Sequence, residues 1–211
     1  MRIAISFFVL VTGVLLAQPV TYEFRPAPGS RFALTVEKTG IWSGKKHVFE
    51  FERYSGSLRF DRNAPAQSQV ELAIDAASAV CKDTWVSEKD RGRILAFMFH
   101  DMIDAERYPR LKFRSTGIVS KTEHMFEATG MLAVRGIEKP ATVIVVIDDH
   151  GGELASLIGQ ATVRLKDYGL KPPRVALGAI GTKDEMMVEF RLVPRLSHDT
   201  AAAGFPERAL R

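Results

Sequence analysis

Apolar and polar residues alternate through most of this chain, and the alternation limits its fold more than any other feature. In the segment 31–37, for example, Phe32, Leu34 and Val36 would all point to one face. The same pattern recurs in the segments 47–52, 54–61, 70–74, 111–113, 125–134, 141–147, 158–165 and 186–193. A period of two residues is typical of half-buried strands in antiparallel sheets. The sequence therefore predicts an all-β protein with about nine strands.

Turn-forming residues separate these segments, as at 61–65, 135–136 and 150–152. Many strands joined by short loops predict either a closed barrel or a sandwich. One aromatic-rich face per strand indicates a large shared apolar interior. A barrel of about eight strands can be filled by its own side chains or can hold one small ligand. The alternation alone does not distinguish these two cases.

A single helix is predicted in the middle of the chain. Ser87, followed three residues later by Asp90, is typical of a helix start. Pro109 is expected to end the helix, because the residue before a proline avoids helical geometry. One face of this helix carries Ile94, Phe97, Met98, Asp101 and Met102. This amphipathic helix should pack over an opening of the barrel or along its flank.

The N-terminal segment indicates export. Residues 3–16 are almost wholly apolar, Arg2 precedes them, and Ala17 offers a small residue for cleavage. The alternative is an uncleaved membrane anchor, but Pro19 follows the apolar run and the run is shorter than the ~20 residues that span a bilayer. We therefore expect a signal peptide at 1–17, one domain at 21–195, a flexible tail at 196–211, and a periplasmic or secreted location.

Charge and cysteine content narrow the partners. The chain has 211 residues with a formal net charge of +4, and no dense Lys/Arg run marks a nucleic-acid site. A weakly basic surface could still rest transiently against anionic lipid, and a homodimer is compatible with the composition. Cys81 is the only cysteine, so no intramolecular disulfide can form, and we expect it to be a buried apolar group.

No catalytic or metal-binding motif stands out, so we expect neither enzyme activity nor a metal site nor a cofactor. Gly-x-Ser-x-Gly, the P-loop and the dinucleotide glycine fingerprint are absent from the sequence. Trp85 could cover a pocket mouth or simply bury loop surface. The five histidines are scattered at His47, His100, His124, His150 and His198. The acids Asp83, Asp90, Asp101, Asp104 and Glu106 are spaced as solvated helix positions and caps.

Several spaced signatures resemble the YceI-like family of exported, lipocalin-like proteins. Tyr54–Asp61 resembles the family's aromatic-x-Gly-x-apolar-x-Phe-Asp strand, and Tyr108–Ser115 resembles its Tyr-Pro-x-apolar-x-Phe-x-Ser element. Gly130–Pro140 resembles its Gly-x-Leu hairpin that ends in Lys-Pro. Asp167–Leu170 and Gly181–Glu185 resemble the two late elements of the family. A departure is Asp90–Ile94, which lacks the His of the family's Arg-Asp-x-His-Leu run.

This resemblance implies an antiparallel eight-stranded barrel with an internal apolar tunnel. It also implies non-catalytic binding or transport of an isoprenoid or related long-chain lipid, of polyprenyl phosphate or quinone type, in the periplasm. A Lys or Arg near an opening could neutralise a phosphate head. The residues expected to line the interior are Phe32, Leu34, Val36, Phe49, Phe51, Leu58, Phe60, Leu72, Ile74 and Phe113. The alternatives are an enzyme acting on a hydrophobic substrate, or a cell-envelope interaction protein with a solid barrel.

Overall fold

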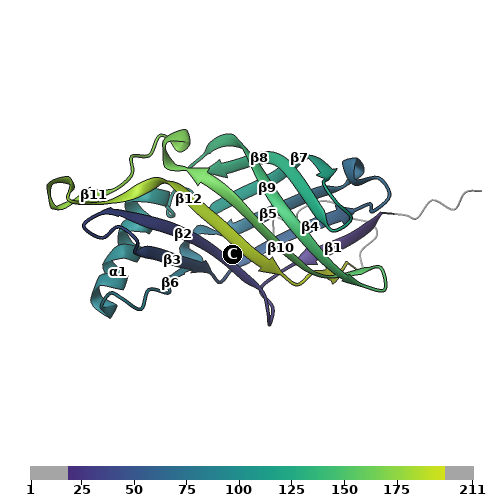
Figure 1. The fold of residues 1–211 in the computed structure, drawn as a ribbon, viewed down its shortest axis with the longest axis horizontal. Helices are drawn as coiled ribbons and strands as arrows, with labels where there is room; N and C mark the ends of the chain where they lie inside the picture. The colour runs from purple at the N-terminus through teal and green to yellow at the C-terminus, as the bar shows by residue number, and fades with distance from the viewer. Residues whose placement is uncertain (1–18, 198–211) are drawn as a thin grey trace, which may run out of the picture.

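One antiparallel sheet of thirteen strands accounts for most of residues 19–197, the part of the chain that the computed structural model describes (Figure 1). The strands are β1 (Val20–Phe24), β2 (Arg31–Gly40), β3 (Lys46–Phe51), β4 (Tyr54–Phe60), β5 (Gln69–Asp75), β6 (Ala79–Cys81), β7 (Arg110–Ser120), β8 (Met125–Val134), β9 (Ile137–His150), β10 (Glu153–Arg164), β11 (Arg174–Val175), β12 (Ile180–Leu192) and β13 (Arg195–Leu196). The helical elements are α1 (Glu88–Phe97), the π-helix η3 (Met98–Ile103), and the 3₁₀ turns η1 (Pro65–Gln67), η2 (Ala76–Ser78), η4 (Leu165–Tyr168) and η5 (Ala176–Gly178).

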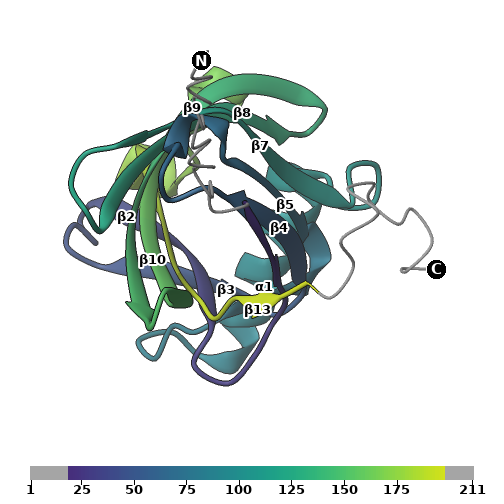
Figure 2. The same cartoon turned by 90° about the vertical axis from the view of Figure 1, so that its right-hand side faces the viewer.

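The sheet curls strongly, and Figure 2 shows its strands arranged around one axis. Hydrogen bonding gives the order β13-β1-β4-β5-β7-β8-β9-β10-β12-β2-β3-β6, with β11 paired to β12. The two strands at the ends of this order come directly after inner strands in the sequence. β6 follows β5 through η2, and β13 follows β12 after two residues. The predicted all-β antiparallel sheet with one helix is confirmed.

All nine segments predicted from the alternation are strands. The described residues contain thirteen strands, not the eight that the family resemblance implies, and the hydrogen-bonded order of the curled sheet ends at β13 and β6 without a pairing between them. The four that the alternation did not reveal are β1, β6, β11 and β13. Each has five residues or fewer, too few for a period of two to be recognised. Two of them follow a longer strand closely: β6 follows β5 after the three residues of η2, and β13 follows β12 after two residues.

A register shift in β7 keeps apolar side chains on the inner face of the sheet. The pairing of β7 with β8 slips between Ser115 and Gly117. Before the shift the inward side chains are at odd positions, as in Phe113, and after it Ile118 points inward. One extra residue in a strand reverses which side chains face each side of the sheet.

The helix begins as predicted and ends earlier. The Ser87 hydroxyl accepts a hydrogen bond from the backbone N–H of Asp90 at 3.1 Å, and α1 runs into η3. The helical segment then ends at Ile103, so the expectation that Pro109 ends it is wrong. Asp104 adopts a left-handed conformation with φ of 53°, and this residue terminates the helix before the proline is reached.

The ends of the chain fall largely outside the description. The predicted signal peptide, residues 1–17, lies outside the described residues, as do residues 198–211 of the predicted tail. Leu196, the first residue assigned to that tail, still pairs with Tyr22 of β1. Between residues 19 and 197, no helix has both the length and the apolar character needed to cross a membrane.

Candidate functional site

The curled sheet encloses a cavity of about 820 Å³. Its wall includes side chains from every strand except β6 and β13, and from α1 and η3. The cavity is within the ~300–1,000 Å³ that small-molecule sites occupy. The interior is therefore not filled by the protein's own side chains, which settles the point that alternation left open.

All ten side chains predicted to face the interior line this cavity, and their role as ligand contacts stays a prediction. They are Phe32, Leu34, Val36, Phe49, Phe51, Leu58, Phe60, Leu72, Ile74 and Phe113. Further apolar lining that the prediction omitted comes from the second half of the sheet, at Val143, Val145, Ile147, Leu157, Val163, Met186, Val188 and Leu192. Their alternation is visible in the sequence, so the same signal could have found them.

Aromatic rings form much of the wall. Phe32 stacks on Phe190 with 5.7 Å between ring centroids and meets Phe51 edge to face at 6.2 Å. Gly159 of β10 lies against the Phe190 ring, and a Cβ there would come within 2.2 Å of it. The absence of a side chain at this position therefore lets Phe190 lie flat against the neighbouring strand.

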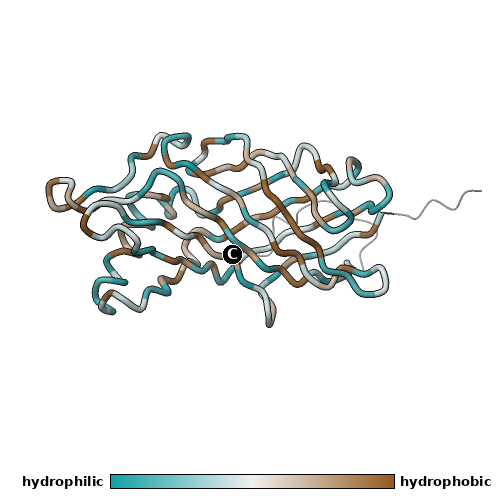
Figure 3. Tube along the Cα trace, in the orientation of Figure 1, coloured by the Kyte–Doolittle hydropathy of each residue, from teal (hydrophilic) through white to brown (hydrophobic). Residues whose placement is uncertain are grey.

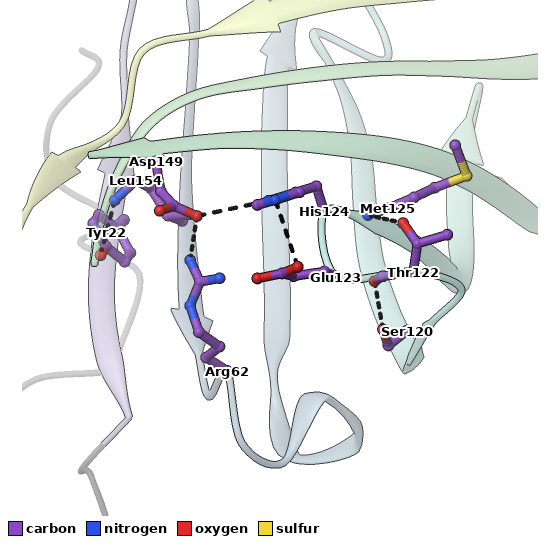
Figure 4. A network of polar contacts seen from close by, with 9 residues as sticks. All are labelled: Tyr22, Arg62, Ser120, Thr122, Glu123, His124, Met125, Asp149 and Leu154. Atoms are coloured by element: carbon purple, nitrogen blue, oxygen red, sulfur yellow. Dashed lines mark hydrogen bonds and ion pairs between the residues drawn. The ribbon is translucent and has the colours of Figure 1, made fainter. Parts of the chain in front are cut away.

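Aromatic rings and polar contacts lie at the end of the sheet near the β9–β10 turn. Phe60 and Phe126 line the cavity there and contact each other edge to face, with centroids 5.5 Å apart. Outside them, Arg62 pairs with Asp149 at 2.6 Å, and His124 lies 3.9 Å from the same carboxylate (Figure 4). These contacts tie three connections together: the one after β4, the β7–β8 turn and the end of β9.

The opposite end of the cavity, beside α1, carries a buried lysine. Lys38 of β2 is 9% exposed and lines the cavity, and its Nζ lies 5.6 Å from the centre of the Trp42 ring. Within residues 19–197, no carboxylate lies within ion-pair distance of this ammonium group. Burial lowers the pKa of Lys38, and the more distant charge of Asp83 partly offsets that effect.

A hydroxyl group adjoins this lysine. Thr182 of β12 is directly opposite Lys38 in the register, and it also lines the cavity. Its Oγ1 is buried and has no hydrogen-bond partner in the described part of the chain. A buried polar group without a partner costs free energy, so Lys38 and Thr182 together form a place where a polar ligand group would be stabilised.

Next to this polar end lies a buried contact between Asp83 and His47 that the sequence did not reveal. Asp83 contacts His47 Nδ1 through Oδ2 at 2.5 Å and accepts the backbone N–H of Val48 at 2.9 Å. The expectation that Asp83 is solvated is wrong, because its side chain is 1% exposed. Its partners are 35 and 36 residues away along the chain, so local spacing could not indicate them.

Trp85 supports the same pair from outside the cavity. Its ring stacks on His47 with centroids 5.1 Å apart, and its Nε1 donates to the Lys46 carbonyl at 2.9 Å. Trp85 does not line the cavity, whereas Trp42, 5.5 Å away from it, does. Of the two interpretations of Trp85, the structure favours burial of loop surface.

The single cysteine has the character of a core residue. Cys81 of β6 is buried and does not line the cavity, and burial raises the pKa of its thiol to about 11. A thiol in this state is a poor nucleophile at neutral pH. Across residues 19–197, no group of three or more His, Cys, Asp or Glu side chains is placed to hold a metal ion.

Comparison with known proteins identifies the family. The profile of the YceI-like domain matches residues 22–193. The chain belongs to the YceI-like domain family. Among curated YceI-like relatives, a "UPF0312 protein" of Pseudomonas putida strain GB-1 is 30% identical over 128 residues, which are 58% of this chain and 63% of that protein. A "UPF0312 protein" of Vibrio campbellii is 32% identical over 56% of this chain and 61% of its own length. This chain thus spans less than two thirds of these relatives.

Solved structures show the same fold. The crystal structure of Burkholderia cenocepacia BcnA matches with a TM-score of 0.59 at 20% identity, over 79% of this chain and 96% of that one. A Campylobacter jejuni YceI protein matches with a TM-score of 0.53 at 16% identity, over 72% and 85% of the two chains. At these identities the likeness concerns the fold alone.

Two YceI-like signatures contact each other in the structure. Gly136, in the β8–β9 turn, has φ of 73°, and a Cβ there would come within 2.8 Å of the Tyr108 ring. Gly130 of β8 lies against the ring of Phe113, which a Cβ would approach to 2.7 Å. The glycines of one signature therefore make room for the aromatic residues of the other.

Proposed function

We propose that this protein binds a long-chain lipid of isoprenoid type inside a lipocalin-like barrel, without catalysing a reaction on it. The apolar cavity carries this proposal. Each buried methylene group stabilises a complex by about 0.8 kcal/mol, so a chain of several isoprene units can bind with few polar contacts. The ten side chains predicted from the sequence, from Phe32 to Phe113, would be among those that contact the tail.

The polar end of the cavity favours an anionic head. The ammonium group of Lys38 is buried, and within residues 19–197 it has no carboxylate in ion-pair distance and the Thr182 hydroxyl opposite it has no hydrogen-bond partner. A phosphate would neutralise the first and accept a hydrogen bond from the second. A quinone ring would leave the lysine charge uncompensated. We therefore favour a polyprenyl phosphate over a quinone, with the tail directed towards Phe60 and Phe126.

The N-terminal segment indicates the compartment in which this binding would take place. Its apolar run followed by Ala17 has the layout of a secretory signal peptide. Binding would then take place in the periplasm or outside the cell, and the bound lipid would be stored or carried there. An N-terminal sequence of the mature protein that starts at Gln18 would support export with cleavage.

Mass spectrometry of small molecules extracted from the purified native protein tests the proposal directly. We expect one prenyl lipid, present in a molar amount close to that of the protein. A second sample is stripped of lipid and offered a polyprenyl phosphate and a quinone of equal chain length in competition, and the phosphate should be taken up preferentially. Recovery of no lipid, together with no uptake of either compound, would refute lipid binding.

A further inference from the structure

Two loops that lie side by side border the cavity at the end where α1 also lines it. We call these loops the tip: residues 38–46, which comprise the end of β2, the β2–β3 turn and the first residue of β3, and residues 171–179, which contain β11 and η5. The backbone N–H of Ile41 donates to the Ala179 carbonyl at 3.1 Å. In Figure 1 both loops project beyond the sheet at the same end as α1. The tip continues into the cavity wall, because Lys38, Trp42 and Arg174 line the cavity.

The tip exposes large apolar side chains that nothing in the described chain covers. The accessible surface relative to that of a fully exposed reference residue is 110% for Leu177, 74% for Ile41 and 58% for Val175. These are the three most exposed large apolar residues between residues 19 and 197, and Trp42, 41% exposed, lies next to them. Figure 3 shows hydrophobic positions in both projecting loops. Scattered exposed apolar residues are ordinary in folded proteins, whereas a cluster on one projecting feature marks an interaction surface.

The backbone of the tip holds Leu177 outward in a conformation that is unusual for its type. Ala176 and Leu177 have φ of 51° and 54°, in the left-handed region that non-glycine residues rarely adopt. The turn is fastened by a hydrogen bond from the Ala179 N–H to the Ala176 carbonyl at 3.0 Å. This strained turn fully exposes a leucine, so no burial of the side chain offsets the strain in the isolated protein. Backbone strain of this kind is typical of functional segments.

The charges of the tip indicate what it meets. Its two loops contain five cationic residues, Lys38, Lys45, Lys46, Lys171 and Arg174, and no Asp or Glu. The nearest acid on β2, Glu37, is already paired with Lys46 and Lys183. Two copies of the protein meeting through this surface would place like charges opposite each other. An anionic lipid surface instead complements the cations and takes up the apolar side chains.

We propose that the tip is a membrane-docking surface, in which Ile41, Trp42, Val175 and Leu177 enter the interface of an anionic bilayer while Lys45, Lys171 and Arg174 contact lipid headgroups. Docking in this orientation places the cavity mouth on the bilayer surface. This proposal goes beyond cargo binding and does not depend on it, because the tip would bind vesicles whether or not the cavity is occupied.

The fluorescence of Trp42 tests the docking at the residue concerned. The chain contains two tryptophans, Trp42 and Trp85, so Trp85→Phe leaves Trp42 as the only probe. The full chain is mixed with vesicles of phosphatidylcholine containing about a third phosphatidylglycerol. Phospholipids brominated near the top of the acyl chain should quench Trp42. Vesicles of phosphatidylcholine alone should give much less quenching.

Two variants and a matched control separate the contributions. In the Trp85→Phe background, the double variant Ile41→Ser/Leu177→Ser should weaken vesicle partitioning by about tenfold or more. Lys45→Glu/Arg174→Glu should weaken it about as much at low salt and less at high salt. Val119→Ser removes an exposed apolar side chain (48%) near the far end of β7 and should change nothing. Circular dichroism verifies that each variant is folded.

Three outcomes would overturn the proposal. Trp42 could remain unquenched in both vesicles, or the serine variant could be quenched as strongly as its parent. The protein could also form a dimer, measured by analytical ultracentrifugation, that dissociates in the serine variant while no vesicle binding occurs. The tip would then be an interface between copies of the chain. Loss of lipid cargo with intact Trp42 quenching would count against the proposed function alone.

Discussion

The replacement of Ala161 by phenylalanine tests whether the cavity is the lipid site. Ala161 lines the cavity from β10, where it pairs with Val143 of β9 and Val188 of β12, both of which also line it. The surrounding side chains are thus those of the wall, and the added ring has only the cavity to enter. The substitution should leave the sheet intact, because phenylalanine is a favourable strand residue.

The magnitude follows from the volume that the ring occupies. Changing a methyl to a benzyl side chain adds six ring carbons, so about six ligand carbons lose their place, at ~0.8 kcal/mol each. The upper limit is therefore about 5 kcal/mol of binding free energy. Partial relaxation of the wall and of a flexible tail should leave at least ~2 kcal/mol, which is a loss of about thirtyfold in affinity.

The assay is the dissociation constant for a fluorescent polyprenyl phosphate, measured on delipidated protein. Thr162→Phe is the matched control, because Thr162 is the next residue of β10, is exposed and carries its side chain on the outer face. We expect its affinity to equal that of the wild type. Equal affinity in Ala161→Phe, with an unchanged thermal transition, would refute binding inside the cavity.

Three further predictions concern buried polar and ionisable side chains in and near the cavity wall. Lys38→Met should raise the unfolding free energy at pH 7 by about 1 kcal/mol. This gain in unfolding free energy should shrink as the pH rises towards 10.5. Burial lowers the pKa of Lys38, so the wild-type side chain loses its proton in the folded protein before it does so in the unfolded chain. Urea denaturation at several pH values measures the difference. Asp83→Ala should cost about 3–5 kcal/mol in the same assay, because it removes both contacts of the carboxylate. Cys81 in the folded protein should react with iodoacetamide at pH 8 at least ~100-fold more slowly than in urea, given its pKa of about 11; comparable rates would contradict its burial.

The sequence was sufficient for the longer strands of the sheet because the alternation is a local property. Phe32, Leu34 and Val36 face the cavity since β2 is extended and its neighbours bury the same side. The short strand β1 escaped notice although Tyr22 and Phe24 are among the most buried residues of the described chain. Five residues carry too little pattern, and the strand is defined by its partners β4 and β13.

The polar part of the site could not be predicted in this way. Lys38 continues the inward positions of β2, but a lysine in an alternating strand is ordinarily placed on the solvent side. Only the tertiary structure, in which β12 pairs with β2 and the Trp42 ring lies near the ammonium group, reveals that the position is buried. The contact of Asp83 with His47 has the same origin, because the pairing of β3 with β6 brings the two segments together.

The two proposals agree on how a lipid would enter. If the tip rests on a bilayer, the cavity mouth and Lys38 face the layer in which anionic headgroups already reside. A lipid can then move tail first into the cavity, towards Phe60 and Phe126, while its head stays at the mouth. Along β2 from Lys38 to Phe32 the tail would be covered over about 20 Å. If the lipid entered head first, its charged head would have to pass through the apolar interior, where an unpaired charge costs many kcal/mol. The position of Lys38 at the tip end therefore favours loading from the membrane through this mouth, and Lys38→Met should slow transfer of a prenyl phosphate from vesicles more than it slows transfer of an uncharged prenyl alcohol.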